Sequence, residues 1–374
     1  MTFGRLAFES VFADESGGNV KTPQAEYLPV GEFPVVDQGK ALIGGYTNLR
    51  ERLCGQGRPA IVFGDHTRCI KYIDFPFCMG ADGVKVLRPK VEANLKYLYY
   101  FLKSLDIPSA GYDRHYKYLK RTEVVLPPLP EQRRIAAILD QADALRVKRR
   151  EALAQLDSLT QSIFIEMFGD YREAELPWPV QPMEKIAADM TIGLVRSAEQ
   201  FGPDFAVPYV RMNAISQGGS FLPRLVMRTE VSEGEFERYQ LRAGDLLFNT
   251  RNSRELVGKT ALFREVGPHV FNNNLMRIRF FDGVHPEYVA AAFQTPYMQQ
   301  ELEIRKAGTT SVFAICAREL RTVPVPVPPL PLQQTFAARI QAIESLKATH
   351  RAALAESDAL FASLQHRAFA GQLS

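Results

Sequence analysis

A long segment of this 374-residue chain occurs twice. Residues 126–169 align without a gap with residues 327–370, an offset of 201 positions. Of the 44 aligned pairs, 16 are identical, whereas ordinary residue usage gives about 3 by chance. A period of about 200 residues is too long for a solenoid, so the repeating unit is a globular domain followed by a further segment. The chain is therefore expected to fold as two related halves.

Each copy of the repeat predicts one long helix. The first copy opens with a proline cluster in which Pro130 suits the first helical turn, and it continues without Pro or Gly from Glu131 to Phe168. Gly169 supplies a natural stop, and Gly371 does so in the second copy. At about 1.5 Å per residue, the first helix has a length on the order of 57 Å. These dimensions suit a spacer.

Apolar residues recur along both helices with a seven-residue period. We place one position of the stripe at Ile135, Ala142, Leu156 and Ile163, and at Phe336, Ile343 and Leu364 in the second copy. We place the other position at Ile138, Leu145, Ala152 and Leu159, and at Leu346, Ala353 and Leu360. A stripe of this width is buried against one partner helix, so we expect the two helices to pair with each other. Parallel and antiparallel pairing are both open on this pattern, and antiparallel pairing relates the two halves by a pseudo-two-fold axis.

The segments between the helices have short apolar runs separated by Gly, Pro, Asn and Asp, which indicates strands and turns. Such runs lie at 33–36, 60–63, 84–87, 245–248 and 275–280, and short helices are expected near 93–104 and 285–296. The predicted fold class is α+β, with two mixed α/β domains separated by two long helices that form an antiparallel coiled coil. The predicted boundaries are 1–125 and 171–326 for the domains, and 126–170 and 327–374 for the helices.

Composition narrows the class of protein. Hydrophobic residues make up 46% of the chain and charged residues 23%, as in soluble globular proteins. No apolar run reaches the roughly 18 residues that cross a bilayer, so we expect a cytoplasmic protein without a membrane segment. Cys54, Cys69, Cys78 and Cys316 stand singly. That spacing encodes neither a disulfide framework nor a zinc site, and buried free thiols are expected.

The net charge of +3 favours no particular partner, but two stretches are locally basic. Residues 114–121 read RHYKYLKR, and residues 242–279 carry seven Arg or Lys against three acidic residues. Basic residues interleaved with Tyr, Asn and Thr are typical of nucleic-acid binding. The alternative interpretation is an ordinary solvated surface.

The duplicated helix start, PPLPEQ at 127–132 and PPLPLQ at 328–333, is accompanied by VFGDHT at 62–67 and GDLLF at 244–248. This combination resembles the specificity subunit of type I restriction-modification systems over essentially the whole chain. The resemblance implies that 1–125 and 171–326 are target recognition domains, each reading one half of a split DNA site. The chain departs from a strict repeat at Leu332, where the first copy has Glu131.

The resemblance also implies the partners. The chain itself would be non-catalytic and without a cofactor, bound to double-stranded DNA. Methyltransferase subunits, two of them, would use S-adenosylmethionine, and a restriction and translocase subunit would use ATP and Mg. In line with this, the sequence of residues 255–260, ELVGKT, imitates a phosphate-binding loop, but Ser253 stands where its first glycine belongs.

Direct readout of DNA uses Arg on guanine and Asn or Gln on adenine, whereas Lys and hydroxyl groups bind phosphates. On this basis the candidate DNA-binding residues of the first domain are Tyr46, Asn48, Arg50, Arg68, Arg114, His115 and Lys117. Those of the second domain are Arg211, Asn213, Asn249, Arg251, Asn252, Arg254 and Lys259. For each residue the alternative is an ordinary surface charge or a hydrogen-bonded turn residue.

The helix pair is predicted to act as a ruler between two half-sites, which on one face of DNA lie roughly 34–36 Å apart. Two other functions are kept as alternatives. One is a protein-interaction scaffold in which the coiled coil is structural, and the other is a nuclease without a recognisable motif. Salt-dependent binding to duplex DNA separates recognition from the first, and a cleavage assay separates it from the second.

Overall fold

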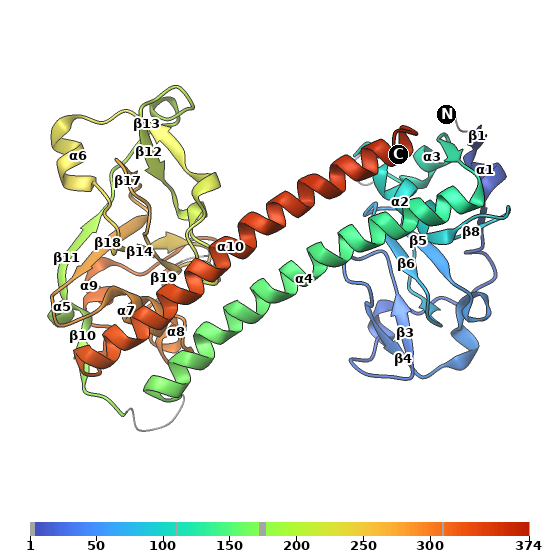
Figure 1. Cartoon of the computed structure of the whole chain (residues 1–374). Coiled ribbons are helices and arrows are strands. Elements are labelled where there is room, and N and C mark those ends of the chain that lie inside the picture. Colours follow the sequence, from blue (N-terminus) through green and yellow to red (C-terminus); the bar gives the residue numbers. More distant parts are fainter. Residues whose placement is uncertain (1–3, 110, 112, 172–176, 309, 374) are drawn as a thin grey trace. The chain divides into compact units, whose positions relative to one another are not determined.

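The structure is a computed structural model that describes residues 4–109, 111, 113–171, 177–308 and 310–373 (Figure 1). It divides into two compact units. Unit 1 comprises Met1–Glu151 and Arg351–Ser374, and unit 2 comprises Ala152–His350. Both repeat helices, α4 (Leu129–Phe168) and α10 (Leu330–Phe369), cross this division. Each unit therefore contains the start of one long helix and the end of the other.

The two predicted long helices are confirmed, and both lie inside their predicted segments, 126–170 and 327–374. Within unit 1, Ile135 and Leu139 near the start of α4 share a core with Phe361 and Ala368 near the end of α10. In unit 2, Phe164 near the end of α4 packs on Phe336 near the start of α10, with ring centroids 5.7 Å apart. In both units the helices therefore run antiparallel.

One position of the predicted seven-residue stripe is wrong. Leu145, Leu159, Leu346 and Leu360 are 54%, 42%, 46% and 53% exposed. The position that faces the partner helix falls one residue later: residues 139, 340, 347, 361 and 368 are buried, and residues 146, 153, 160, 167 and 354 are half-buried. The leucines suggested the wrong register because the true position includes two basic residues, Arg146 and Lys347, which resemble surface residues in the sequence.

Arg146 and Lys347 stand at equivalent points of the repeat and make equivalent ion pairs between the helices. Arg146 Nε lies 2.6 Å from Asp358 Oδ1 in unit 1, and Lys347 Nζ lies 2.9 Å from Asp157 Oδ1 in unit 2. Asp157 and Asp358 are themselves related by the repeat. Lys347 is only 5% exposed, so its charge is held by partners on both helices, Asp157 and Glu344. A polar pair within an apolar seam favours one register.

The described residues of unit 1 form three sheets. The largest has the order β2-β8-β5-β6, formed by β2 (Phe12–Asp14), β8 (Val84–Pro89), β5 (Ala60–Gly64) and β6 (Ile70–Ile73). A second has the order β4-β3-β7, formed by β4 (Gly45–Thr47), β3 (Phe33–Val36) and β7 (Cys78–Met79). β3 and β7 are parallel, and the other neighbours are antiparallel. The third pairs β1 (Gly4–Ala7) with β9 (Glu123–Leu126).

Unit 2 repeats this topology strand for strand. Its largest sheet has the order β11-β18-β14-β16, formed by β11 (Ala187–Ile192), β18 (Leu275–Phe280), β14 (Leu246–Asn249) and β16 (Thr260–Leu262). The second has the order β13-β12-β17, formed by β13 (Met227–Thr229), β12 (Val207–Val210) and β17 (Val270–Phe271), again with one parallel pair. β10 (Val180–Pro182) pairs with β21 (Pro324–Pro326). The predicted α+β class is confirmed, and the divergent sequences had concealed the common strand order.

Unit 2 also has a small sheet of β15 (Arg251–Asn252), β20 (Phe313–Ala314) and β19 (Ala307–Gly308) that has no counterpart among the described strands of unit 1. The short helices of unit 1 are α1 (Phe8–Val11), α2 (Leu95–Ser104) and α3 (Tyr116–Leu119). Those of unit 2 are α5 (Met183–Ile186), α6 (Glu233–Tyr239), α7 (Pro286–Ala292), α8 (Pro296–Glu303) and α9 (Ala317–Arg321). Shorter 3-10 turns occupy Gln24–Glu26, Arg50–Arg52, Cys54–Gly57, Ala198–Gln200, Met212–Ala214 and Pro223–Leu225.

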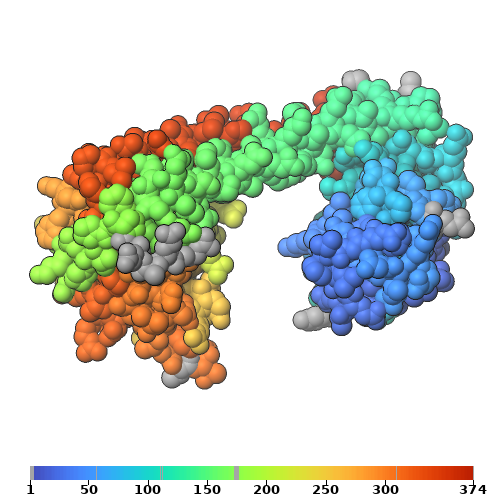
Figure 2. Space-filling view, turned by 90° about the horizontal axis from the view of Figure 1, so that it is seen from below, coloured from blue at the N-terminus to red at the C-terminus, as the bar shows by residue number. Residues whose placement is uncertain are grey.

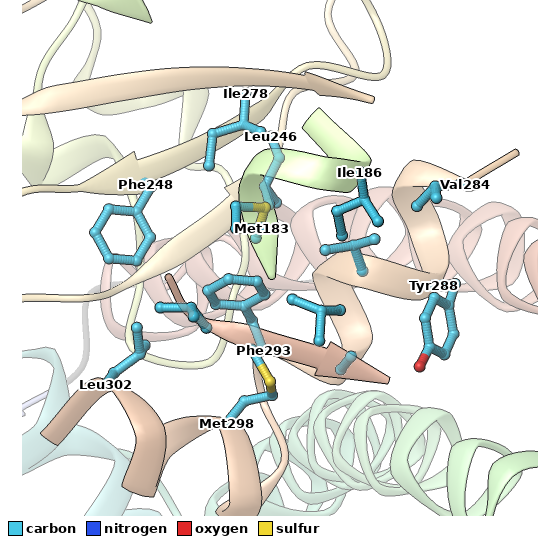
Figure 3. Close-up of a cluster of buried hydrophobic side chains, with 14 of the residues drawn as sticks. Met183, Ile186, Leu246, Phe248, Ile278, Val284, Tyr288, Phe293, Met298 and Leu302 are labelled. Atoms are coloured by element: carbon cyan, nitrogen blue, oxygen red, sulfur yellow. The ribbon is translucent and has the colours of Figure 1, made fainter. Parts of the chain in front are cut away.

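The central strand of each large sheet is buried on both faces, which explains its unbroken apolar run. In unit 1, Ile61 and Phe63 belong to one hydrophobic cluster and Val62 to another. Unit 2 divides in the same way. Figure 3 shows Leu246 and Phe248 of β14 pointing from the sheet toward Phe293, in the cluster that also contains the end of α4. In Figure 2 that green end of α4 adjoins the orange segment that carries α7 and α8.

The start of each long helix is fastened by a buried glutamine of the repeat. Gln132 donates its side-chain N–H to Pro127 O at 2.7 Å and accepts from the backbone N–H of Asn94 at 2.8 Å. Gln333 makes the same two bonds in unit 2, to Pro328 O at 2.7 Å and from the N–H of His285 at 2.8 Å. Both pairs satisfy backbone groups that would otherwise be buried without partners.

A tyrosine near the start of each long helix also makes equivalent contacts in the two units. The hydroxyl of Tyr97 in α2 donates to Val125 O at 2.7 Å, and that of Tyr288 in α7 donates to Pro326 O at 2.6 Å. Tyr97 packs on Phe369, and Tyr288 packs on Phe168, the last residue of the opposite repeat helix in each case. The ring of each tyrosine thus binds the end of one long helix to the unit that holds the start of the other.

The expectation of buried free thiols holds for Cys54 and Cys78, whereas Cys69 is half-buried and Cys316 is exposed. Burial raises the pKa of the Cys78 thiol to about 11. None of the helices in the described part of the chain is both long and apolar enough to span a membrane.

Candidate nucleic-acid interface

In each unit, three segments meet at the ends of the central strands, and we call this place the loop edge. In unit 1 it comprises residues 37–38 after β3, 65–68 after β5 and 80–83 between β7 and β8. The backbone N–H of Gly80 donates to Val36 O at 2.9 Å, and that of Asp65 donates to Gly83 O at 2.7 Å. The Thr67 hydroxyl donates to Gln38 O at 2.5 Å, so all three segments are joined.

The loop edge of unit 2 comprises residues 211–213 after β12, 250–259 after β14 and 272–274 between β17 and β18. Its backbone bonds are equivalent: Asn272 N–H to Val210 O and Thr250 N–H to Asn274 O, both at 2.9 Å. Lys259 Nζ donates to Met212 O at 3.2 Å and to Ile215 O at 2.7 Å. The structure therefore brings together two candidate groups that lie about 40 positions apart in the sequence.

Three predicted DNA-binding residues are engaged in contacts within unit 1 or unit 2. His115 is 1% exposed, and its ring Nδ1 lies 2.8 Å from Asp65 O. Asn249 is fully buried and donates to the carbonyls of Arg251 and Asn274. Lys259 is half-buried and donates hydrogen bonds to the two carbonyls described above. Burial lowers its pKa. As polar residues in basic loops they resembled contact residues, but their side chains hold the loops in place.

Arg68, at the loop edge of unit 1, is exposed, and so is Arg114, which lies outside the three segments of that edge. Arg68 is the one non-glycine residue with a positive φ, 62°, in the described part of the chain, a conformation typical of functional loops. Its Nη1 donates to Ile107 O at 2.8 Å. The positive charge of Arg114 lowers the pKa of Asp82, although the hydrogen bond from Lys21 is the main cause of that shift.

The other candidates of unit 1 lie on different elements. Tyr46 in β4 lines a cavity of about 450 Å³ with Phe33 and Phe75. The adjacent Asn48 accepts a hydrogen bond from the backbone N–H of Glu32 at 2.9 Å. Arg50, in the 3-10 turn that follows, is exposed, and Lys117 in α3 is exposed and paired with Asp113. These four stay predictions, with Asn48 and Lys117 already engaged locally.

In unit 2, Asn213 and Arg251 are exposed, whereas Arg211 and Asn252 are half-buried. Arg211 lies over the ring of Phe201, 5.1 Å from its centroid, and Asn252 Nδ2 donates to Asn249 Oδ1 at 2.8 Å. Arg254 is exposed but paired with Glu303, with Nη2 2.8 Å from Oε1. The segments at 211–213 and 250–252 therefore present polar groups together.

Two parts of the loop edge were missed by sequence reasoning. In unit 1 these are Asp82 and Lys21, whose Nζ lies 2.5 Å from Asp82 Oδ1. In unit 2 they are the three asparagines at 272–274. Only the shared strand register shows that these residues occupy equivalent places. No cluster of three or more His, Cys, Asp or Glu suited to a metal ion is found among the residues that the structure describes.

Comparison with known proteins places the chain in context. The model of the family described as "Type I restriction modification DNA specificity domain" matches residues 15–156 and again residues 194–356. The chain is 24% identical over 273 residues to the EcoKI specificity subunit of Escherichia coli (strain K12), covering 67% of this chain and 58% of that protein. It is 27% identical over 168 residues to the EcoR124I/EcoR124II specificity subunit of Escherichia coli, covering 41% of each. The chain thus aligns with less than two thirds of the length of these relatives.

A solved structure has the same fold. The S subunit of a type I restriction-modification system from M. genitalium superposes with a TM-score of 0.62 at 14% identity. The match covers 98% of this chain and 96% of that one.

Proposed function

Since the chain belongs to the family of the type I restriction modification DNA specificity domain, we propose that it is the sequence-specific DNA-recognition subunit of a type I restriction-modification complex. Each unit reads one half of a bipartite site in double-stranded DNA. The observation that carries this proposal is the loop edge: two units of one topology present the same three segments with different side chains.

The chemistry of the exposed residues suits this task. Arginine offers two parallel donors to guanine, and asparagine offers a donor and an acceptor to adenine. Arg68 and Arg114 in unit 1, and Asn213 and Arg251 in unit 2, are exposed for such contacts. The buried His115 and Asn249 and the half-buried Lys259 support the loops through their hydrogen bonds. Contacts to phosphates by other basic residues position the units but carry no sequence information.

We propose that catalysis resides in partner chains and that this chain binds no cofactor of its own. Methyltransferase chains would supply S-adenosylmethionine chemistry, and a restriction and translocase chain would use ATP and Mg. The repeat supports two methyltransferase chains, because α4 and α10 present equivalent residues, such as the exposed Leu145 and Leu346.

Selection from a random duplex library with the full-length chain tests the recognition proposal. The expected result is two short specified stretches separated by a constant gap, with affinity falling steeply as salt rises. Binding without any sequence preference would contradict the proposal. Absence of salt-dependent DNA binding would favour the protein-interaction scaffold, and cleavage by the chain with a divalent metal would favour the nuclease.

The proposal that α4 and α10 set the gap has its own test. Seven residues inserted after Ala152 and seven after Ala353 keep the seven-residue phase of both helices. We expect both half-sites to be retained and the gap between them to lengthen. A matched variant with the insertion in α4 alone displaces the pairing and should bind poorly. If the variant with both insertions folds and its gap is unchanged, the proposal that α4 and α10 set the gap is wrong.

A further inference from the structure

The two loop edges differ in one connection, which joins β7 to β8 in unit 1 and β17 to β18 in unit 2. In unit 1 it is Gly80–Gly83, and in unit 2 it is Asn272–Asn274. Both are fixed by equivalent backbone bonds at their two ends. The middle of the connection is Ala81 and Asp82 in unit 1, and Asn273 alone in unit 2. The frame is therefore the same, and the side chain that it displays differs.

Asn273 is held by its backbone while its side chain is available. Its N–H donates to Leu194 O at 3.1 Å, and the residue is exposed. Within the described part of the chain its amide makes no hydrogen bond. An asparagine that stabilises a turn normally bonds its own or a neighbouring backbone. The amide of Asn273 does not, so the local structure does not explain this residue.

The residue beside it points to a ligand as well. Asn272 is 7% exposed, and its Oδ1 is buried without a hydrogen-bond donor among the described residues. Buried polar atoms in folded proteins are nearly always paired. Asn274, on the other side, is engaged through its carbonyl with Thr250 and Asn249. The connection is thus fixed by backbone bonds at both ends, and the side chains of Asn272 and Asn273 carry amide atoms without hydrogen-bond partners among the described residues.

The surroundings favour a base over a phosphate as the ligand. Asn273 carries no charge, and the exposed Arg251 and Asn213 of the same loop edge offer groups for the DNA backbone and neighbouring bases. In unit 1 the middle of the connection holds Ala81 and Asp82, and the Asp82 carboxylate is paired with Lys21. A place that holds Asp in one unit and Asn in the other suits contact with base edges.

We propose that Asn273 is a specificity-determining residue of unit 2 that reads an adenine in the major groove, a proposal that rests on the function proposed above. The amide Nδ2–H donates to adenine N7, and Oδ1 accepts from the adenine N6 amino group. Guanine presents only acceptors at these positions, so it leaves Oδ1 without a donor. The side chain therefore selects adenine by its one donor and one acceptor.

The test is selection from a random duplex library with the full-length chain and its Asn273→Ala, Asn273→Asp and Gln300→Ala variants. Gln300 is an exposed amide on α8, outside the loop edge, and serves as the matched control. For Asn273→Ala we expect loss of preference for adenine at one position of one half-site and about 5- to 150-fold weaker binding to the wild-type site. The other half-site, the gap and the salt slope stay unchanged.

Asn273→Asp sharpens the assignment, because a carboxylate only accepts and pairs with the cytosine N4 amino group. We expect the preference at that same position to move from adenine toward cytosine. An Asn273→Ala profile that matches the wild type at every position would overturn the proposal. So would uniformly weaker binding with a smaller salt slope, which marks a phosphate contact. A wild-type chain without any sequence preference would instead count against the proposed function itself.

Discussion

Unit 1 and unit 2 fasten their long helices through the same hydrogen bonds, yet their loop edges display different side chains. Gln132 and Gln333 make matching bonds, whereas the loop edge offers Asp82 in one unit and Asn273 in the other. Residues that hold the frame are constrained by buried partners on several sides. The exposed residues of the loop edges, such as Asn213 and Arg251, lack such buried partners and are constrained mainly by what they bind. The contrast separates the frame of each unit from its proposed recognition surface.

The largest expected effect on stability concerns Phe168 and Phe369, the last residues of the two long helices. Phe168 is 1% exposed, whereas the equivalent Phe369 is only partly buried. We expect Phe168→Ala to lower the free energy of unfolding of unit 2 by about 3–5 kcal/mol, and Phe369→Ala to lower that of unit 1 by less. Urea unfolding followed by hydrogen exchange in each unit measures both. If Phe369→Ala lowers the free energy of unfolding more than Phe168→Ala does, burial does not explain the difference between the two residues.

The buried glutamines should have equal effects. Gln132→Ala and Gln333→Ala each leave one buried N–H and one buried carbonyl without a partner. At roughly 1–3 kcal/mol per unsatisfied group, the two groups together should cost each variant about 2–6 kcal/mol in its own unit. The same hydrogen-exchange measurement applies. Unequal losses would mean that the two helix starts are held differently despite their matching geometry.

The two cross-helix ion pairs should differ slightly. Arg146 contacts Asp358 and also lies over the ring of Phe361, 4.2 Å from its centroid. Double-mutant cycles with alanine should give coupling of about 1 kcal/mol for Arg146 with Asp358, and less for Lys347 with Asp157, because Asp157 is 67% exposed. Zero coupling in both cycles would remove the ion pairs as a cause of the helix register.

The smallest effect concerns acid stability. Burial raises the pKa of Asp189, but hydrogen bonds, chiefly from Arg277, outweigh it and hold the pKa below its usual 3.8. Asp14 in unit 1 is held low in the same way, chiefly by Lys85. A carboxyl whose folded pKa is depressed adds stability that is present above 3.8 and is lost as pH falls through the folded value.

Asp189→Asn should therefore lower the free energy of unfolding at pH 7 by less than about 1 kcal/mol. It should also make the free energy of unfolding of unit 2 depend less on pH in the acid range. Asp14→Asn is the matching variant for unit 1. Unfolding free energies measured between roughly pH 2 and 7 show both effects. If the free energy of unfolding of either variant depends more steeply on pH in the acid range, the pKa of that aspartate is raised in the folded protein and not lowered.

Much of the fold was predictable from particular residues. The repeat with its prolines and terminal glycines gave both long helices, and the runs at 60–63 and 245–248 gave the central strands. The pairing position was misjudged because Leu145 and Leu346 seemed better seam residues than Arg146 and Lys347. Burial of a charged side chain depends on its partners on another helix, and one helix's periodicity does not contain that information.

The recognition surface was less predictable. Residue type alone cannot distinguish Asn249, which is fully buried, from Asn213, which is exposed. The difference arises from strand register, which decides whether a polar side chain bonds the neighbouring backbone or faces solvent. Asn273 was overlooked for the same reason, since its equivalence to the Asp82 region appears only when the two sheets are matched strand by strand.

The most direct measurement is methylome sequencing of a host that expresses this chain with the proposed methyltransferase partner, compared with a host that carries the triple variant Arg211→Ala, Asn213→Ala and Arg251→Ala. If the units read separately on a common frame, the wild-type chain gives a bipartite modified motif. The variant alters one half of that motif and leaves the other half and the gap intact. Alteration of both halves together, or of neither, would contradict the account.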